Sequence, residues 1–257
     1  MNHRIFADRE EAAWMLVERL RANGLCGPRR GATDRLLVLA IPRGGVEIGA
    51  VLARGLNAEL DVVLSRKLRA PHQPELALGA VSETGEVYLN HFATALSEAG
   101  DAYLAAERQR QLAEIARRRD LYRAVRPQAP VAGRTVIVTD DGIATGATMI
   151  AALRTVRAAG AKWVVVAVPV AAPERLPAIR PLCDRLLCLE EPLAFWAIGQ
   201  FYREFPQVED ERVVELLRDY GRSARHESVA AAAAPATAAA PPAAAPTVTR
   251  GAAAQAP

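Results

Sequence analysis

Two adjacent aspartates, Asp140 and Asp141, follow a β-branched apolar run at positions 136–139 and precede a loop of small residues. Such a run is typical of a buried parallel strand, so the carboxylates are expected where a strand ends. From Met149 apolar residues recur at helical spacing until Gly160. A strand, a small-residue loop and a helix N-terminus together favour anion binding, because the first helical N–H groups lack partners and carry partial positive charge.

The loop after the aspartates is small enough for the backbone to close around a phosphate. Its residues include Gly142, Ala144, Thr145, Gly146, Ala147 and Thr148, and the threonines can add hydroxyl donors. Hydrogen bonds to a charged group contribute roughly 1.5–3 kcal/mol each, so about three or four hold a phosphomonoester at micromolar to millimolar affinity. The aspartates suit vicinal hydroxyls or a hard divalent cation instead. This combination predicts a site for a ribose 5-phosphate and Mg²⁺.

A second apolar run, at positions 36–41, ends in Pro42, Arg43, Gly44 and Gly45 before another helical pattern. The glycines allow backbone N–H groups to approach a ligand closely, and Arg43 supplies fixed positive charge. A second anion-binding turn is therefore expected here.

Residues 136–148 resemble the phosphoribosyl-pyrophosphate (PRPP) loop of type I phosphoribosyltransferases, in which two acidic residues follow an apolar run and precede a small-residue turn. The Arg-Gly-Gly turn occupies the place of that family's pyrophosphate loop. The resemblance covers about residues 36–220. It implies Mg²⁺-dependent transfer of phosphoribosyl from PRPP to a nitrogen nucleophile, with a nucleobase as the expected acceptor and pyrophosphate as the leaving group.

The resemblance also implies roles for individual residues. Asp140, Asp141, Arg66 and Lys67 are the expected catalytic residues, and the two aspartates are expected to hold Mg²⁺ directly or through water and PRPP. Residues 66–79 also resemble an uncharacterised bacterial phosphoribosyltransferase group. The cations at 66–69, beside a mobile segment at 70–75, are expected to form a lid. Phe195 and Trp196 are candidates for stacking on the base from a hood.

Two departures from the family pattern bear on the acceptor. Members that use 6-oxopurines carry an aspartate where this chain has Ala144, and a lysine shortly before a proline where this chain has Val170 and Ala171 before Pro173. Both absences count against hypoxanthine or guanine, and the loop is closer to the adenine type. The candidates for a general base or proton carrier are Glu75, Glu83 and His72, so the acceptor stays open.

The elements that must position these residues alternate between strand and helix. This alternation predicts an α/β fold with an open, mostly parallel twisted sheet and helices on both faces. We expect one domain over residues 1–222, with a core at about 36–190 and a small hood from about 1–30 and 191–220. Asp8 should cap an N-terminal helix, a hairpin should surround Gly85, and a helical stretch at 93–126 should break near Gly100. The Ala/Pro-rich tail at 223–257 is predicted to be disordered.

Composition narrows the function classes. The chain has 257 residues and a net charge of +3, which gives no argument for nucleic-acid binding. The cysteines Cys26, Cys183 and Cys188 form no zinc or disulfide pattern. With neither a secretory segment nor a membrane-spanning run in view, we expect a cytoplasmic protein, and we expect a homodimer that binds PRPP and a small-molecule acceptor.

A second function class fits the same loop. A PRPP- or nucleotide-sensing regulatory protein could keep the phosphate cradle and bind ligand without turnover. The small net charge and the lack of a DNA-binding motif weigh against it. A Walker-type NTPase is excluded by the lack of a Gly-Lys-Ser/Thr sequence, and an aspartate-nucleophile phosphatase by the adjacency of the carboxylates.

Overall fold

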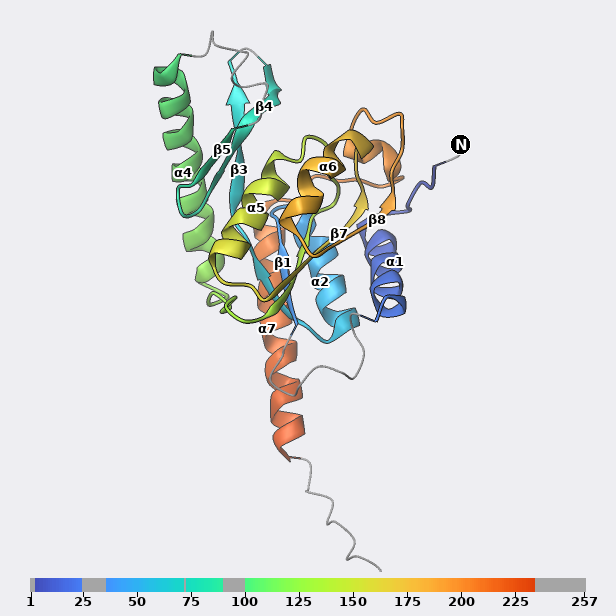
Figure 1. The fold of residues 1–257 in the computed structure, drawn as a ribbon. Coiled ribbons are helices and arrows are strands. Elements are labelled where there is room, and N and C mark those ends of the chain that lie inside the picture. Colours follow the sequence, from blue (N-terminus) through green and yellow to red (C-terminus); the bar gives the residue numbers. More distant parts are fainter. Residues whose placement is uncertain (1–2, 25–35, 72, 90–99, 234–257) are drawn as a thin grey trace, which may run out of the picture.

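The computed structural model describes residues 3–24, 36–71, 73–89 and 100–233. Its centre is a five-stranded parallel sheet in the order β2-β1-β6-β7-β8 (Figure 1). The strands are β1 (Leu37–Ala40), β2 (Glu59–Val62), β6 (Thr135–Thr139), β7 (Trp163–Val170) and β8 (Arg185–Glu190). Ala40 pairs with Thr139 at the carboxyl ends of β1 and β6. The turns that follow these two strands, which carry the two predicted anion sites, therefore leave the sheet side by side.

The alternation of side chains along β1 divides the core into two layers. Val38 and Ala40 pack in one cluster with residues of α1 (Arg9–Ala22), α2 (Gly45–Leu56) and α7 (Asp210–Ala233). Leu37 and Leu39 pack in the other cluster with residues of α5 (Ala147–Ala158) and α6 (Leu176–Ile179). The expected parallel sheet with helices on both faces is confirmed. Three short 3₁₀ helices, Pro173–Arg175, Arg180–Leu182 and Ile198–Phe201, complete the connections.

A smaller antiparallel sheet projects beyond the parallel one, beside α4 (Asp101–Arg123) (Figure 1). Its strands are β3 (Ser65–Ala70), β4 (Gln73–Ser82) and β5 (Val87–Leu89). The hairpin around Gly85 is confirmed, and this glycine has a left-handed φ of 83°. The expected lid differs: the run from Arg66 to Arg69 lies within β3, and residues 73–75 lie within β4, which pairs with β3 in an antiparallel ladder.

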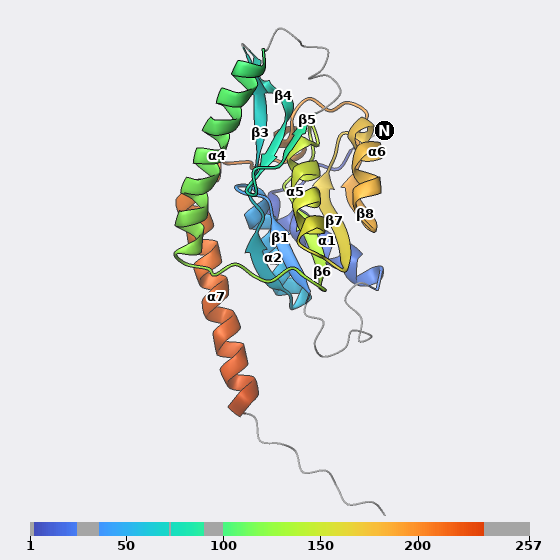
Figure 2. The ribbon, with the colours of Figure 1, turned by 60° about the vertical axis from the view of Figure 1, so that its left-hand side comes forward.

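The segment around Phe6 and the segment around Phe201, from the two parts of the expected hood, are hydrogen-bonded to each other. The Phe6 N–H donates to the Phe201 carbonyl over 2.8 Å, and the Arg203 N–H donates to the Phe6 carbonyl over 2.9 Å. The Asp8 side chain caps α1 by accepting from the Glu11 N–H over 2.8 Å. Figure 2 shows α4 and α7 along the same edge of the molecule. The hood therefore brings α1 next to the segment that leads into α7.

Several sequence-based predictions concern the C-terminal helix or residues that the structure does not describe. The helix α7 continues to Ala233, beyond the expected start of the tail at 223, which agrees with the high helix propensity of alanine. Cys26, His72, residues 90–99 and residues 234–257 lie outside the described residues, as does the side chain of Glu75. Within the described part of the chain, no helix is long and apolar enough to cross a membrane.

Candidate active site

A cavity of about 220 Å³ opens where the turns after β1 and β6 meet. It unites the predicted pyrophosphate-binding and PRPP-binding turns with Lys67 from β3. The lining residues are Pro42, Arg43, Gly44, Lys67, Asp140, Asp141, Gly142, Ile143, Ala144, Thr145, Gly146, Thr148, Met149 and Ile198. Ligands of open parallel sheets bind at the carboxyl ends of the strands, and this cavity lies there.

The phosphate cradle is the start of α5. Gly146 is the N-cap residue, with a left-handed φ of 77° that favours glycine. The buried Thr145 hydroxyl has no hydrogen-bond partner among the described residues. A buried hydroxyl without a partner is costly unless a ligand or water satisfies it. The cradle therefore offers helix N–H groups and an unsatisfied side chain to an anion.

The two aspartates have different surroundings. Asp140 is half-buried, its Oδ1 accepts from the Asp141 N–H over 2.9 Å, and burial together with the charge of Asp141 raises its pKa. Asp141 is buried, and its Oδ2 lies 2.9 Å from both Nε and Nη2 of Arg9. Burial raises the pKa of Asp141, and the Arg9 guanidinium opposes that rise. Of the two aspartates, Asp141 is therefore the one that pairs with Arg9.

Sequence reasoning missed Arg9 altogether. A cation in the first turn of a helix is disfavoured by the helix dipole, and Arg9 stands there between acidic neighbours. That mismatch is the only local signal that its side chain has a distant partner.

The two glycines after Arg43 are required by close packing. A Cβ on Gly44 would lie 1.9 Å from Asp141 Oδ2, and a Cβ on Gly45 would lie 2.9 Å from Asp140 Cα. Contacts below 3.0 Å are essentially never seen for real Cβ atoms, so no larger residue fits without movement. The absence of side chains here lets the turn after β1 press directly against the paired acids.

A model of the phosphoribosyl transferase domain matches residues 29–206. The chain belongs to the phosphoribosyltransferase family. It is 39% identical over 231 residues to a protein named "Putative phosphoribosyl transferase" in two strains of Mycobacterium tuberculosis, CDC 1551 and H37Rv; the match covers 88% of this chain and 50% of the relative. The chain thus spans about half the length of these curated relatives. The crystal structure of TT1426 from Thermus thermophilus is 42% identical, with a TM-score of 0.67 over 84% of this chain and 99% of that chain.

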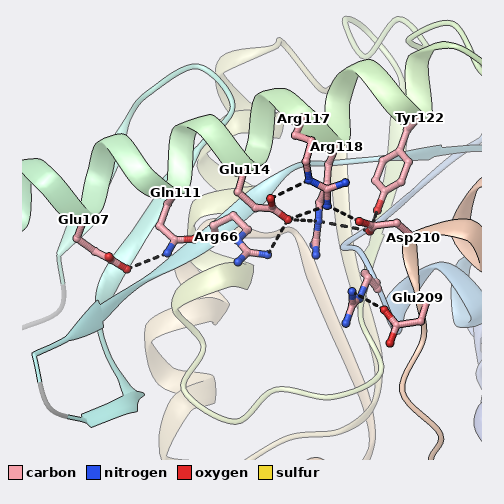
Figure 3. Close-up of polar contacts among 10 residues, drawn as sticks. Arg66, Glu107, Gln111, Glu114, Arg117, Arg118, Tyr122, Glu209 and Asp210 are labelled. Carbon is pink, nitrogen blue, oxygen red and sulfur yellow. Dashed lines mark hydrogen bonds and ion pairs between the residues drawn. The ribbon is translucent and has the colours of Figure 1, made fainter.

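Arg66 and Lys67, both expected at the phosphoribosyltransferase site, lie on opposite faces of β3. Lys67 lines the cavity. Arg66 instead contacts α4: its Nε donates to Gln111 Oε1 over 2.9 Å, and its Nη1 lies 4.0 Å from Glu114 (Figure 3). Burial, followed by the nearby charge of Arg118, lowers the pKa of Arg66. Because side chains alternate along a strand, neighbours in sequence cannot both face the cavity.

Arg43 lines the cavity but is already paired. Its Nη1 lies 3.0 Å from Oε2 of Glu209, in the segment that leads from the hood into α7. Figure 3 shows Glu209 near the polar residues of α4. Glu209 therefore forms an ion pair with the arginine that the family resemblance assigns to pyrophosphate binding.

The two aromatic residues predicted to stack on the base, and the candidate general base Glu83, lie outside the cavity lining. Phe195 packs on Phe201 with 5.2 Å between ring centroids, and Trp196 is 88% exposed. The hood residue that does line the cavity is Ile198. Glu83, a candidate general base, lies outside the lining, and burial raises its pKa while the charge of Arg123 opposes the rise. The satellite core of the hood thus accounts for Phe195, and Trp196 keeps its ring in solvent.

Proposed function

We propose that this chain is a Mg²⁺-dependent phosphoribosyltransferase that transfers the phosphoribosyl group of PRPP to a nitrogen of a nucleobase and releases pyrophosphate. The observation that carries the proposal is the single cavity that unites Arg43, Lys67, Asp140 and the cradle at the start of α5. A 5-phosphate, a ribose and a pyrophosphate require amide, carboxylate and cationic groups, respectively, and the cavity lining supplies all three.

The cavity wall supplies a partner for each part of PRPP. The 5-phosphate would accept from the first N–H groups of α5 and from the hydroxyls of Thr145 and Thr148. Asp140 would accept from a ribose hydroxyl. Lys67 and Arg43, with the turn at Gly44 and Gly45, would hold the pyrophosphate, and Glu209 would compete with it for Arg43.

The donor set at the cavity fits Mg²⁺. Among the residues that the structure describes, no group of three or more His, Cys, Asp or Glu side chains could hold a metal. Mg²⁺ does not need one, since it usually keeps several waters and binds through one or two carboxylates plus substrate phosphates. Asp140 would hold it directly or through water and PRPP, whereas the Asp141 carboxylate is engaged by Arg9. When bound, it would balance negative charge on the pyrophosphate.

The chemistry needs no protein nucleophile. The bond between the ribose C1 and pyrophosphate breaks, and the acceptor nitrogen bonds to C1. Lys67 and Arg43 stabilise the charge that develops on the leaving group, and the Asp140 carboxylate stabilises the positive charge on the ribose. The general base that removes a proton from the attacking nitrogen stays a prediction from the sequence, with Glu75 and Glu83 as candidates.

The proposal is tested by pyrophosphate release. The full chain is incubated with PRPP, Mg²⁺ and a panel of purine and pyrimidine bases, and PRPP binding is measured in parallel by calorimetry. We expect release with at least one base, lost when Asp140 and Asp141 are both changed to Asn. PRPP binding without release on any base would favour the regulatory alternative, and no PRPP binding would overturn both.

We also propose that the chain acts as a cytoplasmic homodimer without nucleic acid. Sedimentation of the purified full chain should give twice the mass of one chain, and a monomer at micromolar concentration would contradict this.

A further inference from the structure

Arg9 is a buried arginine that joins segments distant in the sequence. Only 6% of its surface is exposed. Its guanidinium makes two 2.9 Å contacts to Asp141 Oδ2, donates to the Pro206 carbonyl over 2.9 Å, lies 3.4 Å from Glu47 Oε2, and stacks over the Phe205 ring at 3.8 Å. These partners belong to the PRPP loop, the first turn of α2 and the hood. One side chain therefore touches three of the segments that lie around the cavity.

The position of Arg9 is unfavourable for a merely stabilising residue. It lies in the first turn of α1, where the helix dipole disfavours a cation. Burying an arginine and a carboxylate removes the water from both, and a well-packed apolar pair is often as stable. The planar fork of arginine, however, fixes the partners' geometry in a way that an apolar contact does not.

The Arg9–Asp141 pair is also enclosed by the turn and the hood. Gly44 packs against the Asp141 carboxylate so closely that a Cβ would lie 1.9 Å from Oδ2 and 3.2 Å from Arg9 Nε. On the hood side, the Tyr202 hydroxyl donates to the Asp141 carbonyl over 2.7 Å. The rotamer of Asp141 and the distance between the two ligand-binding turns are thus set by the same contact.

We infer that Arg9 is a positioning residue for PRPP: it clamps Asp141 and thereby holds the PRPP loop, the pyrophosphate loop and the hood in the arrangement that binds the ligand. Asp141 acts through this clamp, and Asp140 is the carboxylate that faces the ribose. The inference rests on the proposed function, because it names which residues prepare that site.

Two variants separate positioning from stability. Arg9→Met keeps an unbranched apolar side chain at this buried position and removes every N–H donor. Arg9→Lys keeps the charge but lacks the planar fork that contacts Asp141 and Pro206 together. The control is Arg54→Met on α2, because Arg54 is an exposed arginine that lines the same outer cavity of about 210 Å³ as Arg9. Calorimetry with PRPP and Mg²⁺ is run on the full chain well below its melting temperature, with circular dichroism confirming the folded state.

We expect the Kd for PRPP to rise at least about tenfold in Arg9→Met, about threefold or more in Arg9→Lys, and less than about twofold in Arg54→Met. A folded Arg9→Met protein with a Kd within about twofold of the wild type would overturn the inference. If Arg9→Met does not fold, an unchanged Kd in Arg9→Lys overturns it in the same way.

A ligand-free measurement distinguishes failure of this inference from failure of the proposed function. Hydrogen exchange should become faster in an Arg9 variant at the amides of Val46, Glu47 and Ile143, which lie in the two turns and are hydrogen-bonded in the structure. Exchange in α4 should stay unchanged. Wild-type protein that does not bind PRPP refutes the proposed function and, with it, the role of Arg9 toward PRPP. If the wild type binds PRPP, unchanged exchange at these three amides refutes the role of Arg9 alone.

Discussion

Two of the arginine–carboxylate networks in the described part of the chain are built differently. The α4 network comprises Arg66, Glu107, Gln111, Glu114, Arg117, Arg118, Tyr122 and Asp210 (Figure 3). In it, Arg117 and Arg118 both contact Glu114 and Asp210. If one of these arginines is removed, each carboxylate therefore still pairs with the remaining arginine. Beneath the cavity, in contrast, Arg9 is the one arginine of the described residues that pairs with Asp141, and it also contacts Glu47 and the hood.

The contrast shows that the number of ion pairs does not measure their functional weight. The α4 network lies on the far side of β3 from Lys67, and its loss should cost stability without changing the ligand site. The Arg9 contacts are few, buried and adjacent to the cavity, so their loss should change binding. The following predictions test this division.

Asp140→Asn should have the largest effect. Removing the carboxylate that faces the ribose should lower kcat/KM on the order of 100-fold to 1000-fold, as for other preorganised electrostatic groups. Asp141→Asn should cost only about fivefold, because the Asn oxygen can still accept from Arg9. Steady-state pyrophosphate release measures both, and equal losses would place both carboxylates on the ligand.

Gly44→Ala should be the next most damaging change. The new methyl group would lie 1.9 Å from Asp141 Oδ2, so the Arg9–Asp141 pair must move. We expect the Kd for PRPP to rise about 30-fold to 100-fold, which is about 2–3 kcal/mol. Gly100→Ala is the matched control, since nothing lies within 4 Å of its added Cβ. Equal calorimetric affinities for the two variants would show that the pair tolerates displacement.

Lys67→Gln and Arg66→Gln should separate the two faces of β3. Lys67 lines the cavity, so its loss should weaken PRPP binding about tenfold, close to 1.4 kcal/mol. Arg66 points to Gln111 and Glu114, so its loss should leave the affinity within about twofold and lower the melting temperature instead. The reverse order of affinities would mean that β3 presents its other face during binding.

Asp210→Asn should act on stability and its pH dependence. Burial opposes ionisation of Asp210, but hydrogen bonds from Tyr122 and Arg117 outweigh it and lower its pKa. The unfolded state therefore binds more protons, so this contribution is present above the ordinary pKa of about 3.9 and is lost as pH falls through the lower folded pKa. The variant should lose about 2 kcal/mol at pH 7 and show a shallower decline in acid. Urea melts from pH 7 to pH 3 measure this, and a changed PRPP affinity would argue against separate networks.

Glu209→Gln should produce the smallest change in PRPP affinity, and this change should be an increase. Glu209 is 54% exposed in its side chain and pairs with Arg43 at 3.0 Å, so it competes with pyrophosphate for that arginine. Removing its charge should tighten PRPP binding about twofold to threefold. Glu215→Gln, which breaks a pair with Arg212 on α7, is the control for net charge. Weaker binding in Glu209→Gln would mean that the Arg43 contact orders the turn for the ligand.

The sequence by itself determined the parallel sheet, its two glycine-bearing turns and the cap of α1. These features depend on short-range patterns: β-branched runs for the strands, small residues before a helix, and an aspartate at a helix start. The register that pairs Ala40 with Thr139 then brings both turns to one cavity, as the strand–helix alternation predicts.

Only the tertiary structure decided which charged residue faces what. Arg66 and Lys67 are adjacent cations that the sequence does not distinguish, and the pleat of β3 places their side chains on opposite faces of the strand. Asp140 and Asp141 are equally indistinguishable until Arg9, 132 residues away from Asp141, binds one of them. Ion pairs between distant segments have no periodicity along the chain, because they form only after packing has placed both partners, so local sequence patterns do not record them.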